Sequence, residues 1–314
     1  MRTLYAVVTV VASLVVLAVA AVAPAQDLPK VTVAMSGWTG FAPLTLAEKT
    51  GIFKKHGADV TIKFIPQKDR HLAIASGDVP CAATTVETWI IWNANGVATK
   101  QVVQLDKSFG ADGMVVRPSI AKIADLKGKT VAASAPGTAP YFTLAWFLKK
   151  NGLTVKDVTV VTMEPGPAAQ AFLAGQNDAA MTYEPYLSAV REKPEAGKII
   201  ATTLDYPMVM DTFGCTPKFI AENEAAVKAL VKSYFDALEM INRDQKQSYE
   251  IMGVDVKQTG EQFGNSAKYL RAGSRQQDVL HRRVPALQQG DPGPDQACRH
   301  ALRAVRLRRK TPAR

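Results

Sequence analysis

Cysteine is scarce in this sequence of 314 residues, and that scarcity argues against two kinds of protein. The three cysteines, Cys81, Cys215 and Cys298, are an odd number with no CxxC spacing, so neither a disulfide framework nor a zinc site is indicated. Cys81 lies in an apolar strand pattern, which predicts a small residue of the core. A bridge between Cys81 and Cys215 in an oxidising compartment stays open, because a sequence does not supply the geometry of a disulfide.

Histidine and the common catalytic motifs are lacking as well. Of the four histidines, His56 and His71 have no HExxH motif or neighbouring ligand spacing, and His281 and His300 lie near the C-terminus. The sequence contains neither a GxSxG nucleophile motif nor a GxGxxG nucleotide-binding motif. We therefore predict no catalytic residue, no metal site and no cofactor, and we do not expect an enzyme.

The positive charge is confined to one end of the chain. From Arg271 onward, eleven Lys or Arg residues stand against three Asp, so this segment carries +8 of the net charge of +10. A nucleic-acid interface needs Lys and Arg clustered on a folded face with interleaved aromatic residues, and the rest of the sequence shows no such cluster. We therefore expect no nucleic-acid partner.

The first 25 residues have the pattern of a signal peptide. A weakly basic start, Met1-Arg2, precedes an almost continuously apolar run from Leu4 to Val22. The small residues of Ala23-Pro24-Ala25 then fit a cleavage site before Gln26. The alternative is an uncleaved membrane anchor, since the run could nearly span a bilayer. We favour cleavage and export, because Gln26-Asp27 after the apolar run does not resemble the residues that follow a stop-transfer segment.

Strands and helices alternate after this segment. Alternation of this kind predicts an α/β fold, with a mainly parallel sheet covered by helices on both faces. The expected elements are a strand at 30–34, a helix at 43–55, a strand at 59–65, a helix at 69–75, a strand at 81–83 and a helix that carries Trp89 and Trp92.

The same plan returns in the second half of the chain. Lys149-Lys150-Asn151-Gly152 echoes Lys54-Lys55-His56-Gly57, and further echoes follow in the same order. We infer two lobes of one topology: lobe 1 from 26–107 and 208–270, and lobe 2 from 108–207. The crossings between them are expected at 105–113 and 204–212, and helices within 219–240 are expected to pack back on lobe 1.

Residues 271–314 differ in character from the rest of the chain. They contain Arg-Arg and Gln-Gln pairs and Asp291-Pro292-Gly293-Pro294, with almost no aromatic residue. One interpretation is a disordered basic tail. The interpretation that we favour is a shifted reading frame, because suitable codons read one base later for residues 279–289 encode an ordinary amphipathic helix.

Candidate binding residues lie where predicted strands end and where the chain crosses between lobes. Open α/β sheets bind ligands beyond the carboxyl ends of their strands. Acidic groups beside aromatic rings suit a cationic or NH-rich ligand, although acids at helix starts also serve simply as caps. The candidates are Trp38, Thr39, Thr84, Thr85, Glu87, Asp106, Pro136, Gly137, Thr138, Tyr183, Glu184 and Asp211.

Three segments together resemble a known family. They are Ala47–Gly57, Leu126–Ala132 with Pro136-Gly137-Thr138, and Ala174–Ala180 leading to Glu184-Pro185. The chain is similar to periplasmic solute-binding proteins of ABC importers, in the nitrate/sulfonate/taurine group that also includes thiamine-pyrimidine binders. The resemblance covers roughly residues 30–270.

The resemblance implies a two-lobed type II periplasmic binding protein fold. It implies a periplasmic, monomeric protein that captures a small nitrogen- or sulfur-containing solute between its lobes and delivers it to a membrane permease. In that family the regions of Trp38-Thr39, Thr84–Glu87, Gly137-Thr138 and Glu184 contact the ligand. Ala135-Pro136-Gly137-Thr138 departs from the usual Ser-Gly-Thr type of anion-binding turn, which argues against a sulfonate or nitrate ligand.

Two other functions share this fold. Pyrimidine-synthesising enzymes similar to the family carry a cysteine-rich motif and a reactive histidine, and nothing in this sequence matches that motif. An exported ligand-sensing domain would differ only in the partner that its closed form contacts. We regard transport-linked binding as the main hypothesis and keep both alternatives.

Overall fold

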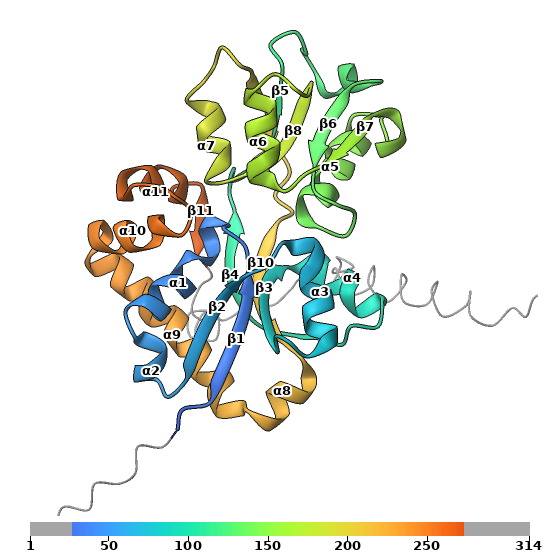
Figure 1. Ribbon diagram of the computed structural model, residues 1–314. Coiled ribbons are helices and arrows are strands. Elements are labelled where there is room, and N and C mark those ends of the chain that lie inside the picture. Colours follow the sequence, from blue (N-terminus) through green and yellow to red (C-terminus); the bar gives the residue numbers. More distant parts are fainter. Residues whose placement is uncertain (1–26, 273–314) are drawn as a thin grey trace, which may run out of the picture. The chain divides into compact units, whose positions relative to one another are not determined.

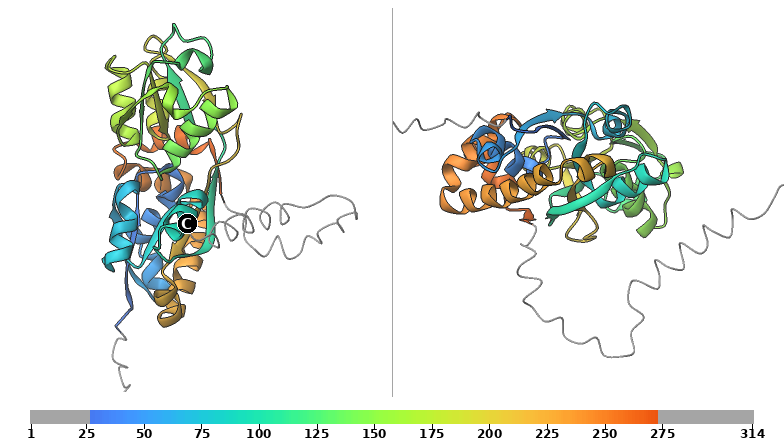
Figure 2. Two further views of the ribbon diagram at one scale, coloured as in Figure 1. Left: turned by 90° about the vertical axis from the view of Figure 1, so that its right-hand side faces the viewer. Right: turned by 90° about the horizontal axis from the view of Figure 1, so that it is seen from below.

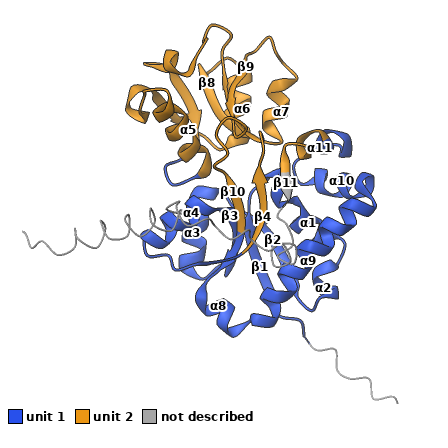
Figure 3. Cartoon of the chain, turned by 180° about the vertical axis from the view of Figure 1, so that it is seen from behind, with its two compact units in different colours: residues 1–102, 135–138, 213–264 blue, residues 103–134, 139–212, 265–314 orange. Residues whose placement is uncertain are grey.

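The computed structural model describes residues 27–272, which form two compact units (Figures 1 and 3). Within this range, unit 1 comprises 27–102, 135–138 and 213–264, and unit 2 comprises 103–134, 139–212 and 265–272. The predicted signal peptide lies outside the described residues, as does the predicted tail beyond residue 272. The predicted lobe boundaries, at 107/108 and 207/208, stay predictions.

Three parallel strands form the part of the unit 1 sheet that the sequence analysis foresaw. They are β1 (Lys30–Met35), β2 (Asp59–Phe64) and β3 (Cys81–Thr85). β1 lies between the other two and is parallel to both, with Lys30 opposite Asp59 and Val33 opposite Cys81. Every residue of β3 is buried, because helices cover a sheet of this kind on both faces.

The helices of unit 1 follow the predicted alternation, with one correction. The predicted helix at 43–55 is wrong as a single element: it is two helices, divided at Gly51, whose φ of 74° lies in the left-handed region. The first helices of unit 1 are η1 (Thr39–Phe41), α1 (Ala42–Lys49), α2 (Ile52–Lys55), α3 (Gln67–Ser76) and α4 (Val86–Ala94).

The C-terminal part of the described chain is helical. α9 packs against α1 and α2, so the prediction that helices within 219–240 return to the first part of the chain is confirmed (Figure 2). The hydroxyl of Ser233 donates to the carbonyl of Ile52 across this contact. The four helices are α8 (Pro217–Glu222), α9 (Glu224–Arg243), α10 (Gln245–Val254) and α11 (Gly260–Ala267).

Unit 2 contains a five-stranded sheet in the order β7-β6-β8-β5-β9. The strands are β5 (Asp112–Val116), β6 (Thr130–Ala133), β7 (Thr159–Thr162), β8 (Ala179–Tyr183) and β9 (Lys198–Thr202). The helices are η2 (Ile123–Leu126), α5 (Ala139–Lys150), η3 (Val155–Asp157), α6 (Pro165–Leu173) and α7 (Tyr186–Arg191).

The two sheets repeat one strand order. In β2-β1-β3 and in β7-β6-β8, the first strand of the chain lies between the second and the third, and all pairings are parallel. Right-handed connections then place the first and second crossover helices on opposite faces. The predicted repeat of one topology is therefore confirmed.

Both sheets are mixed rather than mainly parallel. β5 is antiparallel to β8 and to β9, and β11 (Leu270–Ala272) is antiparallel to β4 (Lys100–Ser108). The full order of the other sheet is β11-β4-β10-β3-β1-β2, where β10 spans Met210–Cys215. The predicted crossings at 105–113 and 204–212 lie partly in strands: residues 105–108 belong to β4, 112–113 to β5 and 210–212 to β10.

The indole of Trp89 lies in a small core of unit 1, where it packs edge to face on Trp92 at a ring-centroid distance of 5.0 Å. Gly214 on β10 leaves room for it, because a Cβ there would lie 3.0 Å from the Trp89 ring and 2.7 Å from the carbonyl oxygen of Lys100. Both tryptophans therefore belong to the core of unit 1.

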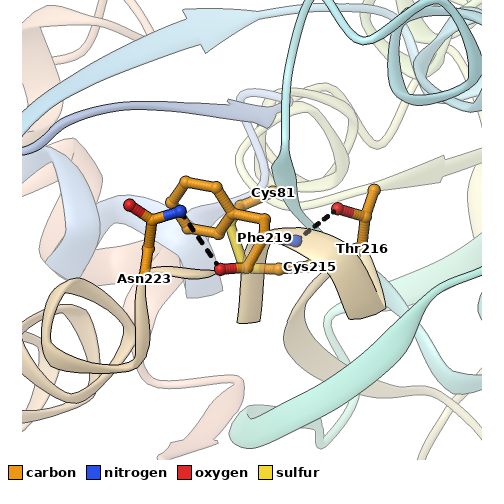
Figure 4. Close-up of a disulfide and its surroundings, with 5 residues drawn as sticks. All are labelled: Cys81, Cys215, Thr216, Phe219 and Asn223. Atoms are coloured by element: carbon orange, nitrogen blue, oxygen red, sulfur yellow. Dashed lines mark hydrogen bonds between the residues drawn. A yellow bond between two sulfur atoms is a disulfide. The ribbon is translucent and has the colours of Figure 1, made fainter. Parts of the chain in front are cut away.

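A disulfide joins Cys81 on β3 to Cys215 on the neighbouring strand β10 (Figure 4). The pairing left open in the sequence is therefore formed, and both residues are fully buried. After Cys215, the hydroxyl of Thr216 accepts a hydrogen bond from the Phe219 amide at 3.2 Å and caps α8. No helix within residues 27–272 has the length and apolar character needed to cross a membrane.

Candidate functional site

In the sheet of unit 1, β2 lies on one side of β1 and β3 lies on the other, so the order of the strands switches direction at β1. β1 leads to Trp38 and Thr39, while β3 ends in Thr84 and Thr85. Because β1 and β3 are parallel neighbours, their carboxyl ends lie at the same edge. Open α/β sheets bind ligands at such switch points. This edge of unit 1 is our candidate site.

A network of side-chain hydroxyls occupies the edge. The amide nitrogen of Gln67 donates to Thr84 Oγ1 at 2.8 Å and to Thr88 Oγ1 at 2.9 Å. Thr88 Oγ1 also lies 2.8 Å from Thr85 Oγ1, and all three threonines are buried. Gln67 and Thr88 are not among the predicted site residues. Gln67 is the first residue of the helix that follows β2, so it lies at the same edge of the parallel sheet as the other candidates. Its place in the order of elements could therefore have predicted it.

Glu87 lies in the first turn of α4, directly after these threonines. Its Oε1 atom is buried and accepts no hydrogen bond from the described residues. Burial raises the pKa of the carboxyl from 4.5 to about 7, against the opposing effect of hydrogen bonds from the Thr85 side chain and the Glu87 backbone. A carboxyl of this kind favours a partner that brings a positive charge or an N–H donor.

Trp38 and Thr39 are both buried beside this edge, at 4% and 2% exposure. The carbonyl of Trp38 accepts a hydrogen bond from the Phe41 amide at 3.0 Å, which closes the turn that starts η1. The hydroxyl oxygen of Thr39 has no hydrogen-bond partner among the described residues. A second buried polar atom without a partner therefore follows the neighbouring strand.

Arg70 ties two strand ends to α3. Its guanidinium donates to the carbonyl of Ile65, after β2, at 2.8 Å and to the carbonyl of Ala83, in β3, at 2.7 Å. The side chain is fully buried. Arg70 is not among the predicted site residues, and it holds Ala83, the residue directly before Thr84.

In unit 2, Glu184 forms an internal ion pair. Its Oε1 atom accepts a hydrogen bond from Arg191, and its Oε2 atom accepts one from the Ser188 amide at 3.0 Å. The guanidinium of Arg191 also donates to the carbonyl of Gly110 and lies 3.9 Å from the ring centroid of Tyr269. Burial raises the pKa of the Glu184 carboxyl, and Arg191 and Ser188 oppose the rise. This predicted site residue thus has partners within its own unit.

Tyr183 precedes this pair at the end of β8. It lies opposite Asp112 in the ladder with β5, and its ring packs at 5.9 Å from that of Tyr186. The side chain is 9% exposed, so most of the ring belongs to the core of unit 2. The peptide bond between Glu184 and Pro185 is cis.

The segment Pro136-Gly137-Thr138 forms the turn between β6 and α5. Gly137 has a φ of 88°, which explains a glycine at this position. The hydroxyl of Thr138 donates to the carbonyl of Ala135 at 2.7 Å and closes the turn. Pro136 is exposed, and Pro140 lies in the first turn of α5.

The remaining candidates, Asp106 and Asp211, lie on β4 and β10. These strands are neighbours in the sheet, and both side chains are 2% exposed. The structure thus gathers Thr84, Thr85 and Glu87 around one network, whereas the two aspartates belong to the strands where the chain passes between units. Among residues 27–272, no cluster of three or more His, Cys, Asp or Glu side chains could hold a metal ion.

The chain belongs to a known family. Residues 38–248 match the family model described as NMT1/THI5 like, which covers more than half of the sequence. The taurine-binding periplasmic protein of Escherichia coli (strain K12) is 27% identical over 216 residues, which are 66% of this chain and 65% of that protein. The resemblance stated from the sequence is confirmed.

Solved structures show the same fold. The alkanesulfonate-binding protein SsuA from Xanthomonas axonopodis pv. citri, bound to MOPS, has a TM-score of 0.67 and 18% identity, over 80% of this chain and 88% of that chain. The desulfurization enzyme DszB has a TM-score of 0.56 and 14% identity, over 80% of this chain and 89% of that chain. The fold is that of periplasmic binding proteins, as predicted, and an enzyme also uses it.

Proposed function

We propose that this protein is the periplasmic solute-binding component of an ABC importer. It captures a small nitrogen- or sulfur-containing solute and delivers it to a permease in the membrane. Membership of the family and the likeness to a taurine-binding periplasmic protein support this proposal. Capture of the solute between the two lobes stays a prediction from the resemblance.

One observation carries the choice of solute. The buried Oε1 atom of Glu87 has no hydrogen-bond donor among the described residues, and it lies at the switch point where this class of sheet binds ligands. An ammonium, guanidinium or N–H group of the solute would supply the missing donor. Charge-assisted hydrogen bonds of this kind contribute about 1.5–3 kcal/mol each.

The sulfonate-binding neighbour suggests an anionic group instead, and the two indications are compatible. A zwitterion such as taurine carries both an ammonium and a sulfonate. We propose that Glu87 receives the cationic end of such a solute. The ion pair that Glu184 forms with Arg191 leaves this glutamate less suited to that role, although it stays among the predicted site residues.

Thermal unfolding of the purified protein tests the proposal. The panel contains taurine, alkanesulfonates, nitrate, urea, guanidinium, thiamine and its pyrimidine. A solute at about a hundred times its Kd raises the free energy of unfolding by about 2.7 kcal/mol, and the Tm rises measurably. We expect a rise with a solute that carries a cationic or N–H group; a rise with nitrate alone would contradict the proposed role of Glu87.

Affinity measurements on variants then locate the site. Glu87→Gln is expected to weaken binding of the stabilising solute at least tenfold, a loss of at least about 1.4 kcal/mol. Glu192→Gln is the matched control, because Glu192 is an exposed glutamate outside the candidate site. Equal affinities for both variants and the wild-type protein would remove Glu87 from the site.

The likeness to DszB keeps an enzymatic alternative. Incubation of each stabilising solute with the protein, followed by mass spectrometry, separates the two functions. A binding protein returns the solute unchanged at a stoichiometry of one, whereas an enzyme releases product over many turnovers. The third hypothesis, a sensing domain, predicts a protein partner other than a permease in pull-down experiments with the loaded protein.

A further inference from the structure

A series of side-chain hydrogen bonds leads from Gln67 through Thr88 to Thr85, two residues before Glu87. We propose that Gln67, Thr88 and Thr85 form a relay of hydrogen bonds that ends on the Glu87 carboxyl and keeps it an acceptor. Gln67 and Thr88 are then positioning residues that make the site select solutes with a cationic or N–H group. The choice of solute rests on the proposed function, whereas the relay is a property of the ligand-free protein.

Gln67 is the donor at the start of the relay. The nitrogen of a primary amide donates hydrogen bonds and accepts none. Its two hydrogens point to Thr84 Oγ1, at 2.8 Å, and to Thr88 Oγ1, at 2.9 Å. Both hydroxyl oxygens therefore act as acceptors toward Gln67, and the hydrogen of Thr88 is left to donate elsewhere.

The next hydrogen bond of the relay joins Thr88 to Thr85. Each hydroxyl has a single hydrogen, and Thr88 Oγ1 lies 2.8 Å from Thr85 Oγ1. In the proposed relay Thr88 donates to Thr85, so that the hydrogen of Thr85 is directed to the carboxyl of Glu87, two residues further along the chain. Hydrogen bonds in such a chain polarise one another, so each donor strengthens the next in a buried setting. Thr85 and Thr88 are buried at 4% and 0% exposure.

The titratable and charged residues on the elements around Glu87 have partners of their own. α4 packs on β3, whose titratable residue Cys81 is held in the disulfide. On α3, Arg70 donates to backbone carbonyls, and the ring of His71 lies 6.2 Å from that of Trp92 on α4. Also on α3, Lys68 and Asp69 pair with each other at the surface. Burial and hydrogen bonds, rather than a neighbouring charge, set the pKa of Glu87.

The relay has a consequence for recognition. A protonated Glu87 could itself donate to the oxygen of a sulfonate or nitrate. Donation from Thr85 favours the ionised carboxylate, which can only accept. Solutes that present donors are therefore preferred over solutes that present acceptors.

NMR titration of the ligand-free protein tests the relay directly. The carboxyl carbon of Glu87, assigned with Glu87→Gln, gives its titration midpoint. Thr85→Val is expected to raise the midpoint by about one pH unit, a tenfold gain in proton affinity. Thr88→Val and Gln67→Met are expected to raise it by at least about 0.3 unit, a twofold gain. Thr85→Ser and Thr88→Ser keep the hydroxyls and are expected to keep the wild-type midpoint.

A double variant shows whether the groups act in series. Removal of Thr85 interrupts the relay before Glu87, so Thr85→Val with Thr88→Val is expected to match Thr85→Val alone. Additive shifts, or wild-type midpoints in both Thr88→Val and Gln67→Met, would overturn the relay. Because no solute is present, this result is independent of whether any member of the panel binds. A variant that fails to fold is replaced by Thr→Ala at the same position.

Discussion

Cys81 on β3 and Cys215 on β10 are bonded across two neighbouring strands, and they close a loop of 134 residues. The bridge lies three residues before Thr84, so it also anchors the strand that presents the candidate site. It therefore links residues 27–102 of unit 1 to residues 213–264, the later segment of the same unit.

Reduction of this bridge is expected to destabilise the protein. A loop of this length corresponds to about 5 kcal/mol of loop entropy, and native disulfides contribute typically about 2–4 kcal/mol. Thermal unfolding with and without reductant measures the difference. Cys298→Ser is the matched control and should keep the wild-type Tm, whereas Cys81→Ala should not. Free thiols at both Cys81 and Cys215 in alkylated, purified protein would contradict the bridge.

The stability of the ligand-free protein is expected to fall as the pH rises from about 4.5 to about 7. The folded-state pKa of Glu87 is raised from 4.5 to about 7, so the folded state binds the proton more tightly than the unfolded state. This contribution is complete below pH 4.5 and is lost above pH 7. Its full size is about 3 kcal/mol.

Urea unfolding at several pH values checks this dependence on Glu87. The Glu87→Gln variant carries no titrating group at this position. It is expected to gain stability relative to the wild type as the pH rises through this window. A difference between the two proteins that is constant from pH 4 to pH 8 would contradict the raised pKa.

Removal of Arg191 is expected to destabilise the protein more than removal of both members of its ion pair. Arg191→Met leaves the Glu184 carboxyl buried without its cation, which costs about 3–5 kcal/mol. Arg191→Met with Glu184→Gln removes the charge as well and should recover part of that loss. A double-mutant cycle by urea unfolding measures the coupling, and a coupling of zero would argue against the pair.

A contact between α2 and α9 predicts a second pH dependence. His56 Nε2 lies 2.8 Å from Asp236 Oδ2, and this hydrogen bond is the main cause that lowers the pKa of Asp236 below 3.8. The contribution is present above the unfolded-state pKa and is lost as the pH falls through the folded-state value. Asp236→Asn should cost about 1 kcal/mol at pH 7 and less at pH 3.

Lys55→Ala serves as the control for that contact. Lys55 also approaches Asp236, at 3.5 Å, but its side chain is 71% exposed. Exposed ion pairs contribute about 0–1 kcal/mol, so this variant should unfold close to the wild type. Equal losses for Lys55→Ala and His56→Ala would show that charge, rather than the hydrogen bond, holds the contact.

Much of the fold follows from local patterns. The strand at 59–64 and the helix at 67–76 lie close to their predicted positions, because apolar periodicity and a glycine at the end of a helix are local signals. The antiparallel strands β5 and β9 were not predicted as such, since strand direction depends on which segments meet in space.

The candidate site shows the same division. Glu87 and the threonines could be placed at a sheet edge from the order of elements alone. The partner of Glu184 could not be foreseen, because Arg191 lies seven residues further along the chain, at the end of α7. The hydrogen bonds of Gln67 likewise depend on how α3 packs over β3.

The residue order is sufficient for the alternation of elements, the repeated topology and the edge where a ligand should bind, because each depends on periodicity and on general rules of chain connection. The disulfide, the direction of each strand pair and the protonation of Glu87 depend on contacts between segments far apart in the chain. Burial and hydrogen bonding at such contacts are set only when the chain has folded, so they had to be taken from the three-dimensional arrangement.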